Sequence, residues 1–136
     1  MSIASPSRQP ITISGLKHGL VEQYFQTLNA QDFNNTAGLF ARDGELHPPL
    51  EEPVVGNSAI AQYLAQEAMG MTLVPQKGTI AREDQGELDI RIQGYVKTSL
   101  FTVNVAWQFL INADNQFQIV VVKLLASWEE LAQIQR

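Results

Sequence analysis

Cysteine is absent from the 136-residue chain. This absence excludes disulfide bonds, thiolate nucleophiles and Cys-ligated metal sites. Charged residues are also scarce, at 17% of the chain, whereas about 25% is typical of soluble domains. The 9 basic residues are outnumbered by 14 acidic ones and form no block. The sequence therefore does not predict binding to nucleic acid or to anionic lipid, because both need clustered Lys and Arg.

Long apolar runs are missing as well. The longest, Ile119–Val122, is far shorter than the ~20 residues of a membrane-spanning helix. The stretch Met1–Pro10 is polar and lacks the apolar core of a signal peptide. We expect a cytoplasmic protein with a flexible N-terminal tail over residues 1–12 and one domain over residues 13–136.

The first half of the chain has the periodicity of helices. Residues 13–30 predict a helix with Ser14 as its N-cap and an apolar face. A second, short helix is predicted from Asp32, and a third over residues 59–69. Between them, Asp43-Gly44 is typical of a turn and Glu45–His47 of a short strand. The apolar face of the first helix comprises Leu16, Leu20, Val21, Tyr24, Phe25 and Leu28.

The second half alternates as strands do. The expected strands are Met71–Val74, Gly78–Arg82, Leu88–Thr98, Thr102–Ile111 and Phe117–Leu125, with a hairpin turn over residues 113–116 and a short C-terminal helix opening at residues 127–130. This order predicts an α+β domain. About four long antiparallel strands, with short ones beside them, form a curved sheet that packs on three N-terminal helices. The cone so formed leaves a pocket between the first helix and the concave face.

Catalytic signatures are weak. No metalloprotease, nucleophile-elbow or phosphate-loop motif occurs. His18 lies off the apolar face of the first helix and is expected in solvent, and His47 is expected at the rim of a pocket. The acids Glu83, Asp84 and Glu87 crowd a predicted hairpin turn and are expected to be solvated.

Two aromatic hydrogen-bond donors are more informative. Tyr24 lies on the apolar face of the first helix, and Trp107 lies mid-strand among apolar residues. Each donor needs an acceptor when buried. The two could converge on one carbonyl oxygen inside an apolar pocket. Taken alone, the pattern favours ordinary core aromatics bonded to backbone or water.

A family resemblance instead favours a ligand-binding role for these two aromatic residues. The segments 21–33, 37–40, 46–49, 53–56, 104–112 and 124–127 resemble the C-terminal domain of cyanobacterial orange carotenoid proteins, within the nuclear transport factor two-like superfamily. The combination of Asn104-Val105-Ala106-Trp107 with Tyr24 is the most specific part. The resemblance runs from about residue 13 to the end, without the helical carotenoid-binding domain, as in stand-alone homologues of that C-terminal domain.

The resemblance implies a keto-carotenoid of the echinenone or canthaxanthin type, held inside a homodimer. It places Tyr24 and Trp107 on the ring carbonyl of the carotenoid. It also implies carotenoid exchange with a helical carotenoid protein, with Glu67 as the docking acid, transient membrane contact for uptake near thylakoids, and photoprotection by quenching of singlet oxygen. The implied pocket walls are Leu28, Leu73, Phe101, Val105, Val122 and Leu124.

The chain departs from that family pattern in three ways. The stretch 94–107 is shorter than in the two-domain relatives, with Leu100-Phe101 standing there. The cysteine of several relatives is missing, which excludes redox control of dimerisation. Lys123 replaces an acid.

Two other functions stay open. The same cone could serve an isomerase, dehydratase or cyclase, with His47 and Tyr24 as the candidate catalytic residues. An Asp or His on the pocket floor would favour catalysis, whereas unbroken apolar walls would favour a carotenoid. The chain could also be a dimerisation module that binds no ligand.

Overall fold

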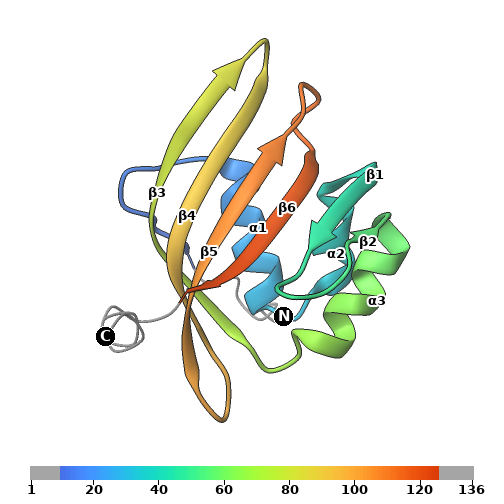
Figure 1. The fold of residues 1–136 in the computed structure, drawn as a ribbon, viewed down its shortest axis with the longest axis vertical. Helices are drawn as coiled ribbons and strands as arrows, with labels where there is room; N and C mark the ends of the chain where they lie inside the picture. The colour runs from blue at the N-terminus through green and yellow to red at the C-terminus, as the bar shows by residue number, and fades with distance from the viewer. Residues whose placement is uncertain (1–9, 126–136) are drawn as a thin grey trace, which may run out of the picture.

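Helices and short strands fill the first half of the computed structural model, and long strands fill the second half (Figure 1). The structure describes residues 10–125. Its elements are α1 (Gly19–Asn29), α2 (Phe33–Gly38), β1 (Phe40–His47), β2 (Val54–Val55), α3 (Asn57–Glu67), β3 (Thr72–Asp84), β4 (Glu87–Lys97), β5 (Thr102–Ile111) and β6 (Phe117–Leu125).

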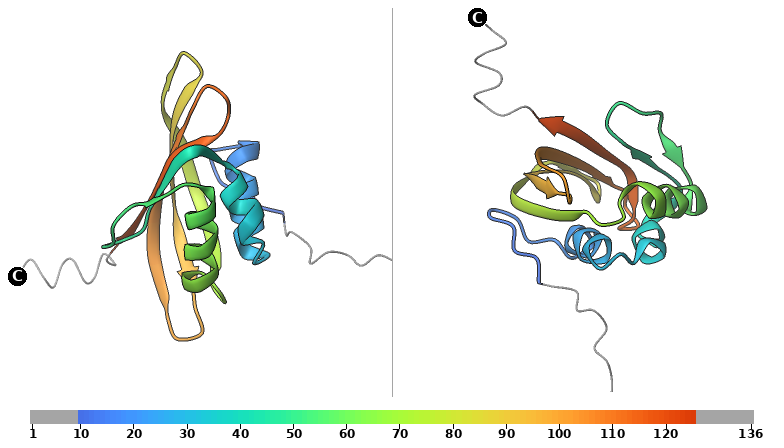
Figure 2. Two further views of the ribbon diagram at one scale, coloured as in Figure 1. Left: turned by 90° about the vertical axis from the view of Figure 1, so that its right-hand side faces the viewer. Right: turned by 90° about the horizontal axis from the view of Figure 1, so that it is seen from below.

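The strands form one curved sheet in the order β2-β1-β6-β5-β4-β3, with the helices against one face (Figure 2). Strands β3 to β6 are antiparallel neighbours. This arrangement confirms the predicted α+β fold with four long antiparallel strands. The sheet as a whole is mixed, because β1 runs parallel to β6, with Leu46 opposite Val120.

The turn predicted at Asp43-Gly44 is wrong. Both residues lie inside β1, where the register with β6 shifts between Phe40 and Glu45. A side chain at Gly44 would lie 2.8 Å from the carbonyl oxygen of Phe117, so only glycine fits this bulge. The Asp-Gly pair therefore bends β1, which stays paired with β6. It does not reverse the direction of the chain.

The predicted start of the first helix is also wrong. Helix α1 begins at Gly19 with His18 as N-cap, because the segment before it pairs with the edge of the sheet. The backbone N–H of Ser14 donates to Gln76, and that of Gly78 donates to Ser14, both at 2.9 Å. Ser14 thus extends a strand edge and does not cap a helix.

The strand predictions hold more closely. Strands β5 and β6 have the predicted bounds. The two short strands expected around Pro75 form one long edge strand, β3, with register shifts at Pro75/Lys77 and Ile80/Arg82. A proline is tolerated at such an edge bulge. The helix predicted to open at residues 127–130 lies outside the described residues.

The core lies between α1 and the concave face of the sheet. Its aromatic rings meet mostly edge to face, the favoured geometry for such pairs. The ring of Phe25 has its centroid 5.2 Å from Tyr24 and 4.9 Å from Trp107. The centroid of Tyr24 lies 5.0 Å from that of Phe109 on β5. Within residues 10–125, no helix is long and apolar enough to cross a bilayer.

A close approach of backbones at Gly94 gives a stability prediction. A Cβ there would overlap the carbonyl oxygen of Val74 and would lie 2.8 Å from Cα of Pro75. We expect Gly94→Ala to lower the free energy of unfolding by about 2–3 kcal/mol, because backbone of β3 would have to move. The measurement is urea unfolding followed by circular dichroism.

Gly19→Ala is the matched control, since nothing lies within 4 Å of a Cβ built at that helical position. This variant should be as stable as the wild type or more stable by up to about 1 kcal/mol. Equal stability of the two variants would contradict the close packing of β3 on β4.

Candidate functional site

A cavity of about 260 Å³ lies between α1, α3 and the concave face of the sheet. Its inner end is formed by buried side chains of α1 and β5. Its mouth lies where α3, the β4–β5 turn and the end of β6 come together. The lining is nearly all apolar: Tyr24, Leu28, Leu46, Pro48, Pro49, Tyr63, Leu64, Glu67, Ala68, Met71, Leu73, Val96, Thr98, Phe101, Val103, Val105, Trp107, Val122 and Leu124.

All eight residues predicted to bind the ligand line this one cavity. Five of them are buried in its inner part: Tyr24, Leu28, Leu73, Val105 and Trp107. Val122 is half-buried on β6. Phe101 and Leu124 are 57% and 54% exposed and stand at the mouth. The structure thus brings together residues that are up to 100 positions apart in the sequence, from Tyr24 to Leu124.

Tyr24 and Trp107 each contribute one hydrogen-bond donor to this lining. Each side chain is 2% exposed and borders the cavity. Within residues 10–125, no protein acceptor binds the Tyr24 hydroxyl or the Trp107 indole N–H, although both residues make ring contacts. Donors enclosed by apolar walls favour a ligand that brings an acceptor oxygen to them.

Burial raises the pKa of the Tyr24 phenol well above its usual range. The cause is desolvation, which disfavours the phenolate. Tyr24 is therefore neutral throughout the physiological range and keeps its O–H as a donor. A neutral O–H donor suits a carbonyl oxygen, because a carbonyl oxygen accepts hydrogen bonds and has no proton to donate.

Side chains at the end of α1 fix its distance from β3. The amide of Asn29 donates to the carbonyl of Leu73 at 2.9 Å, and its oxygen accepts from the Leu73 N–H at 2.8 Å. Gln31 accepts from the N–H of Gly70 at 3.0 Å. These contacts hold Leu28 of α1 and Leu73 of β3 on opposite walls of the cavity.

Glu67 lies at the rim of the cavity, as the last residue of α3, and is exposed. It is the lone carboxylate among the lining residues in the described part of the chain. Tyr63, one turn earlier, donates from its hydroxyl to Glu51 at 2.9 Å. Burial, together with this hydrogen bond, raises the pKa of Tyr63. The rim hydroxyl thus already has a partner, unlike that of Tyr24.

His47 does not line the cavity. Its neighbour Leu46 points inward, so the alternation of a strand places His47 on the opposite face. There its Nε2 lies 2.8 Å from a carboxylate oxygen of Glu45. Residues two apart in a strand share a face, which brings the side chains of Glu45 and His47 together. This pair lies apart from Tyr24, the other candidate catalytic residue.

His18 is half-buried, contrary to the expectation of a solvated side chain. The backbone before it folds against β3 and does not continue as helix. Its Nδ1 is buried without a hydrogen-bond partner. Burial lowers the pKa of His18, against the opposing attraction of Glu22.

The inner part of the cavity carries no catalytic acid or base. None of the described lining residues is an Asp or a His. The predicted solvation of Glu83, Asp84 and Glu87 is confirmed, since all three are exposed at the β3–β4 turn. Nor do three His, Asp or Glu side chains gather as metal ligands anywhere in residues 10–125. The walls therefore match those expected for binding an apolar ligand.

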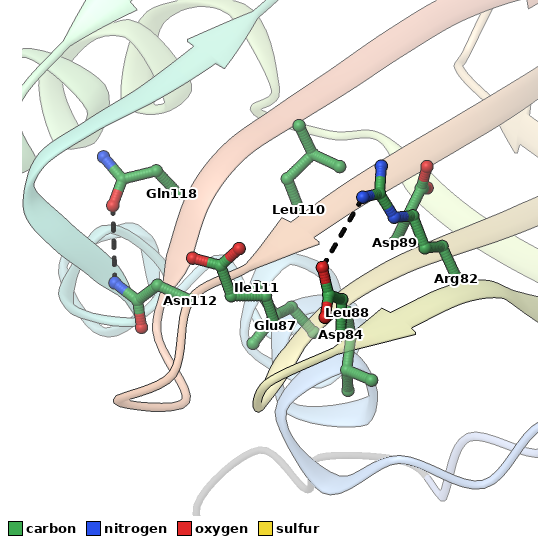
Figure 3. A pocket seen from close by; sticks show the side chains of 9 residues that line it. All are labelled: Arg82, Asp84, Glu87, Leu88, Asp89, Leu110, Ile111, Asn112 and Gln118. Carbon is green, nitrogen blue, oxygen red and sulfur yellow. Dashed lines mark hydrogen bonds and ion pairs between the residues drawn. The ribbon is translucent and has the colours of Figure 1, made fainter.

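A second hollow, of about 310 Å³, lies near the β3–β4 and β5–β6 turns, and six of its nine lining residues are polar or charged (Figure 3). Its charged groups are paired or open to solvent. Arg82 lies 3.6 Å from Asp84, and Asn112 donates to Gln118 at 3.4 Å. Nothing in it calls for a further ligand.

Sequence reasoning missed part of the lining. Val103 could have been found, because it shares a strand face with Val105 and Trp107. The others depend on how α3 and the loops around it are placed, which no local pattern reports. They are Leu46, Pro48, Pro49, Tyr63, Leu64, Ala68, Met71, Val96 and Thr98.

Comparison with protein families gives one match that covers most of the chain. Residues 16–122 match the nuclear transport factor 2 (NTF2) domain. The chain is also 37% identical to the orange carotenoid-binding protein of Limnospira maxima over 128 residues. That alignment takes in 91% of this chain but 40% of the relative. The chain thus spans less than half of the relative's length, and the part matched is the C-terminal domain.

Solved structures give the same result. The orange carotenoid protein of Anabaena (Nostoc), solved binding canthaxanthin, superposes with a TM-score of 0.85 at 33% identity. The match covers 96% of this chain and 43% of that one. An epoxide hydrolase/cyclase-like enzyme of salinomycin pyran ring formation has a TM-score of 0.63 at 16% identity, over 78% of this chain and 88% of its own. At 16% identity, this comparison shows that the two proteins share a fold and nothing more.

The buried phenol of Tyr24 predicts how stability depends on alkaline pH. In the unfolded chain a tyrosine ionises near pH 10, whereas the folded protein keeps this phenol protonated. The unfolded state therefore loses a proton that the folded state retains, and folding loses about 1.4 kcal/mol for each pH unit above about 10. Tyr24→Phe should lose less stability than the wild type over this range.

The measurement is urea unfolding of both proteins from pH 8 to pH 11.5, with each protein referred to its own value at pH 8. Parallel pH dependence of wild type and Tyr24→Phe would contradict a desolvated phenol at this position.

Proposed function

The chain belongs to the NTF2 domain family, and we propose that it binds a keto-carotenoid non-covalently and passes it to a protein partner. The observation that carries the proposal is the pair of donors, Tyr24 and Trp107, which border an apolar cavity with no protein acceptor among the described residues. Similarity to orange carotenoid proteins, one of them solved binding canthaxanthin, supports the choice of ligand.

The donor set fits the end ring of a keto-carotenoid. Tyr24 and Trp107 would each donate to the ring carbonyl, worth roughly 0.5–1.5 kcal/mol per bond. Their two dipoles would also stabilise negative charge on the carbonyl oxygen, which lowers the excitation energy of the conjugated chain. Leu28, Leu73 and Val105 would contact the apolar ring. No chemical step by the protein is required.

The cavity of one copy is too small for a whole carotenoid, which is why we propose a dimer. A carotenoid is roughly as long as the ~30 Å hydrocarbon core of a bilayer. A cavity of about 260 Å³ is below the range of about 300–1,000 Å³ that encloses a drug-sized ligand. One copy of the chain therefore covers one end, and a second copy, placed mouth to mouth, would cover the other.

Burial provides most of the affinity. The polyene exposes several hundred Å² of apolar surface, so its burial supplies on the order of 10 kcal/mol before ordering costs are subtracted. Because the attachment is non-covalent, the ligand can leave again for a protein with a larger apolar tunnel. While bound, the polyene would quench singlet oxygen, a property of the conjugated chain itself.

Glu67 is the proposed contact for a helical carotenoid protein. It is exposed beside the mouth, so a cation of the partner could pair with it while the two cavities face each other. We expect Glu67→Gln to slow carotenoid transfer several-fold at low salt, since an exposed ion pair acts mainly on association. Equal rates for variant and wild type at low salt would contradict this role.

The carbonyl contacts are tested by absorption spectra. The wild-type protein, loaded with keto-carotenoid in a producing host, should be coloured. The double variant Tyr24→Phe, Trp107→Phe should absorb at shorter wavelength, because the dipoles that polarise the chain are gone. The measurement is the visible spectrum of each purified protein.

Tyr63→Phe is the matched control, because Tyr63 also lines the cavity but donates to Glu51. Its spectrum should equal that of the wild type. An unshifted double variant would refute the carbonyl contacts, and a colourless wild-type protein would refute carotenoid binding altogether.

A further inference from the structure

Met71 is the one sulfur-containing side chain among the described residues that line the ligand cavity. It lies in the connection between α3 and β3, packs against the core and is half-buried. Met69, two residues earlier, is 63% exposed and is not among the lining residues. One thioether therefore belongs to the ligand site, whereas the other belongs to the outer surface.

Thioethers are the most readily oxidised groups in a chain without thiols. This chain has no cysteine and three methionines, Met1, Met69 and Met71. The aromatic donors of the cavity, Tyr24 and Trp107, are each 2% exposed. Met71 is half-buried instead, which leaves it within reach of a small solute. An oxidant at the mouth of the cavity therefore has Met71 as its readiest target in the site.

The backbone on both sides of Met71 is fixed by hydrogen bonds. Its own N–H donates to the carbonyl of Ala68 at 3.1 Å. The glycine before it donates its N–H to the side chain of Gln31 at 3.0 Å. Two residues later, both backbone groups of Leu73 bind the amide of Asn29. This connection cannot swing away without breaking these bonds, so a chemically altered Met71 stays part of the cavity wall.

We propose that Met71 is an oxidation site, at which hydrogen peroxide converts the thioether to a sulfoxide and so lowers the affinity of the cavity for its apolar ligand. One peroxide oxygen is transferred to the Sδ atom. The O–O bond breaks, an S–O bond forms, sulfur loses two electrons, and the other oxygen leaves with both hydrogens as water. The identity of the ligand rests on the proposed function, to which this site adds a control that needs no cysteine.

The sulfoxide oxygen is a polar acceptor in a cavity with few free donors. The hydroxyls of Thr98 and Tyr63 already donate to protein oxygens, at 3.1 Å and 2.9 Å. The other side-chain donors of the described lining are those of Tyr24 and Trp107. A sulfoxide at Met71 therefore competes with the ligand carbonyl for these two donors, stays unpaired, or draws water into the cavity. Each of these outcomes disfavours a bound apolar ligand.

Peroxide treatment of the empty protein tests the proposal. The full-length chain, produced without carotenoid, is treated with hydrogen peroxide, freed of it, and mixed with canthaxanthin in detergent micelles. The oxidised wild type should bind on the order of tenfold more weakly than the untreated protein, because a polar group now lies in an apolar wall. Met71→Leu should keep its affinity after the same treatment, since leucine fills a similar volume and has no sulfur.

Met69→Leu is the matched control, because it removes the exposed thioether and leaves Met71 in place. Its affinity should fall on oxidation as that of the wild type does. Mass spectrometry of peptides should locate an added oxygen at Met71, and methionine sulfoxide reductases should restore binding. Unchanged affinity of the oxidised wild type, an equal fall in Met71→Leu, or oxidation confined to Met1 and Met69 would each overturn the proposal.

Nile red, a fluorescent apolar dye, separates this proposal from the proposed function. If the untreated wild type takes up the dye but no canthaxanthin, the proposed function fails, and the change in dye affinity on oxidation still decides the role of Met71. If canthaxanthin binds equally well before and after oxidation of Met71, the oxidation site alone fails. An untreated wild type that takes up neither probe would overturn both.

Discussion

The edge-to-face packing of Phe25 between Tyr24 and Trp107 is the contact on which the rest of the site depends. Its ring lies 5.2 Å from Tyr24 and 4.9 Å from Trp107 between centroids. Through this one side chain, helix α1 and strand β5 set the positions of both donors at once. Because packed interiors resist small displacements, neither donor can turn away to find a backbone acceptor without disturbing the other. Their free hydrogen-bonding capacity is thus a consequence of core packing.

The same packing divides the molecule into two unlike ends. The rings of Phe25, Phe109 and Phe117 fill the space under one part of α1. Tyr24 and Leu28 of the same helix border the cavity. Toward the α3 end the lining side chains are smaller, such as Ala68 and Val96, and the cavity opens. Asn29 and Gln31 keep it open by holding the start of β3 and the loop before it. Charged residues crowd the β3–β4 turn, whereas the opening is lined mostly by apolar side chains with Glu67 at its rim.

Local sequence patterns predict the elements that pack on the core but not those whose place is decided by distant partners. Alternation over Thr102–Ile111 identified β5 and its inward Trp107, because one buried face imposes a period of two. Ser14 failed as an N-cap because β3 offers it backbone partners. Asp43-Gly44 failed as a turn because β6 pairs alongside. The donor chemistry of Tyr24 and Trp107 drew attention to them, and the family resemblance gave them a ligand role. Met71 and Pro48 reach the cavity only through the placement of α3.

The chemistry of the cavity favours holding a carbonyl over transforming it. An isomerase or dehydratase moves a proton and needs a group whose pKa is near the working pH. The Tyr24 phenol has its pKa pushed the other way by burial, and an indole N–H is a donor only. Glu67 stands at the rim in solvent, and His47 on the opposite face of the sheet. Two fixed neutral donors can polarise an oxygen but cannot accept a proton from its neighbours, which suits the proposed non-covalent binding of a carbonyl group.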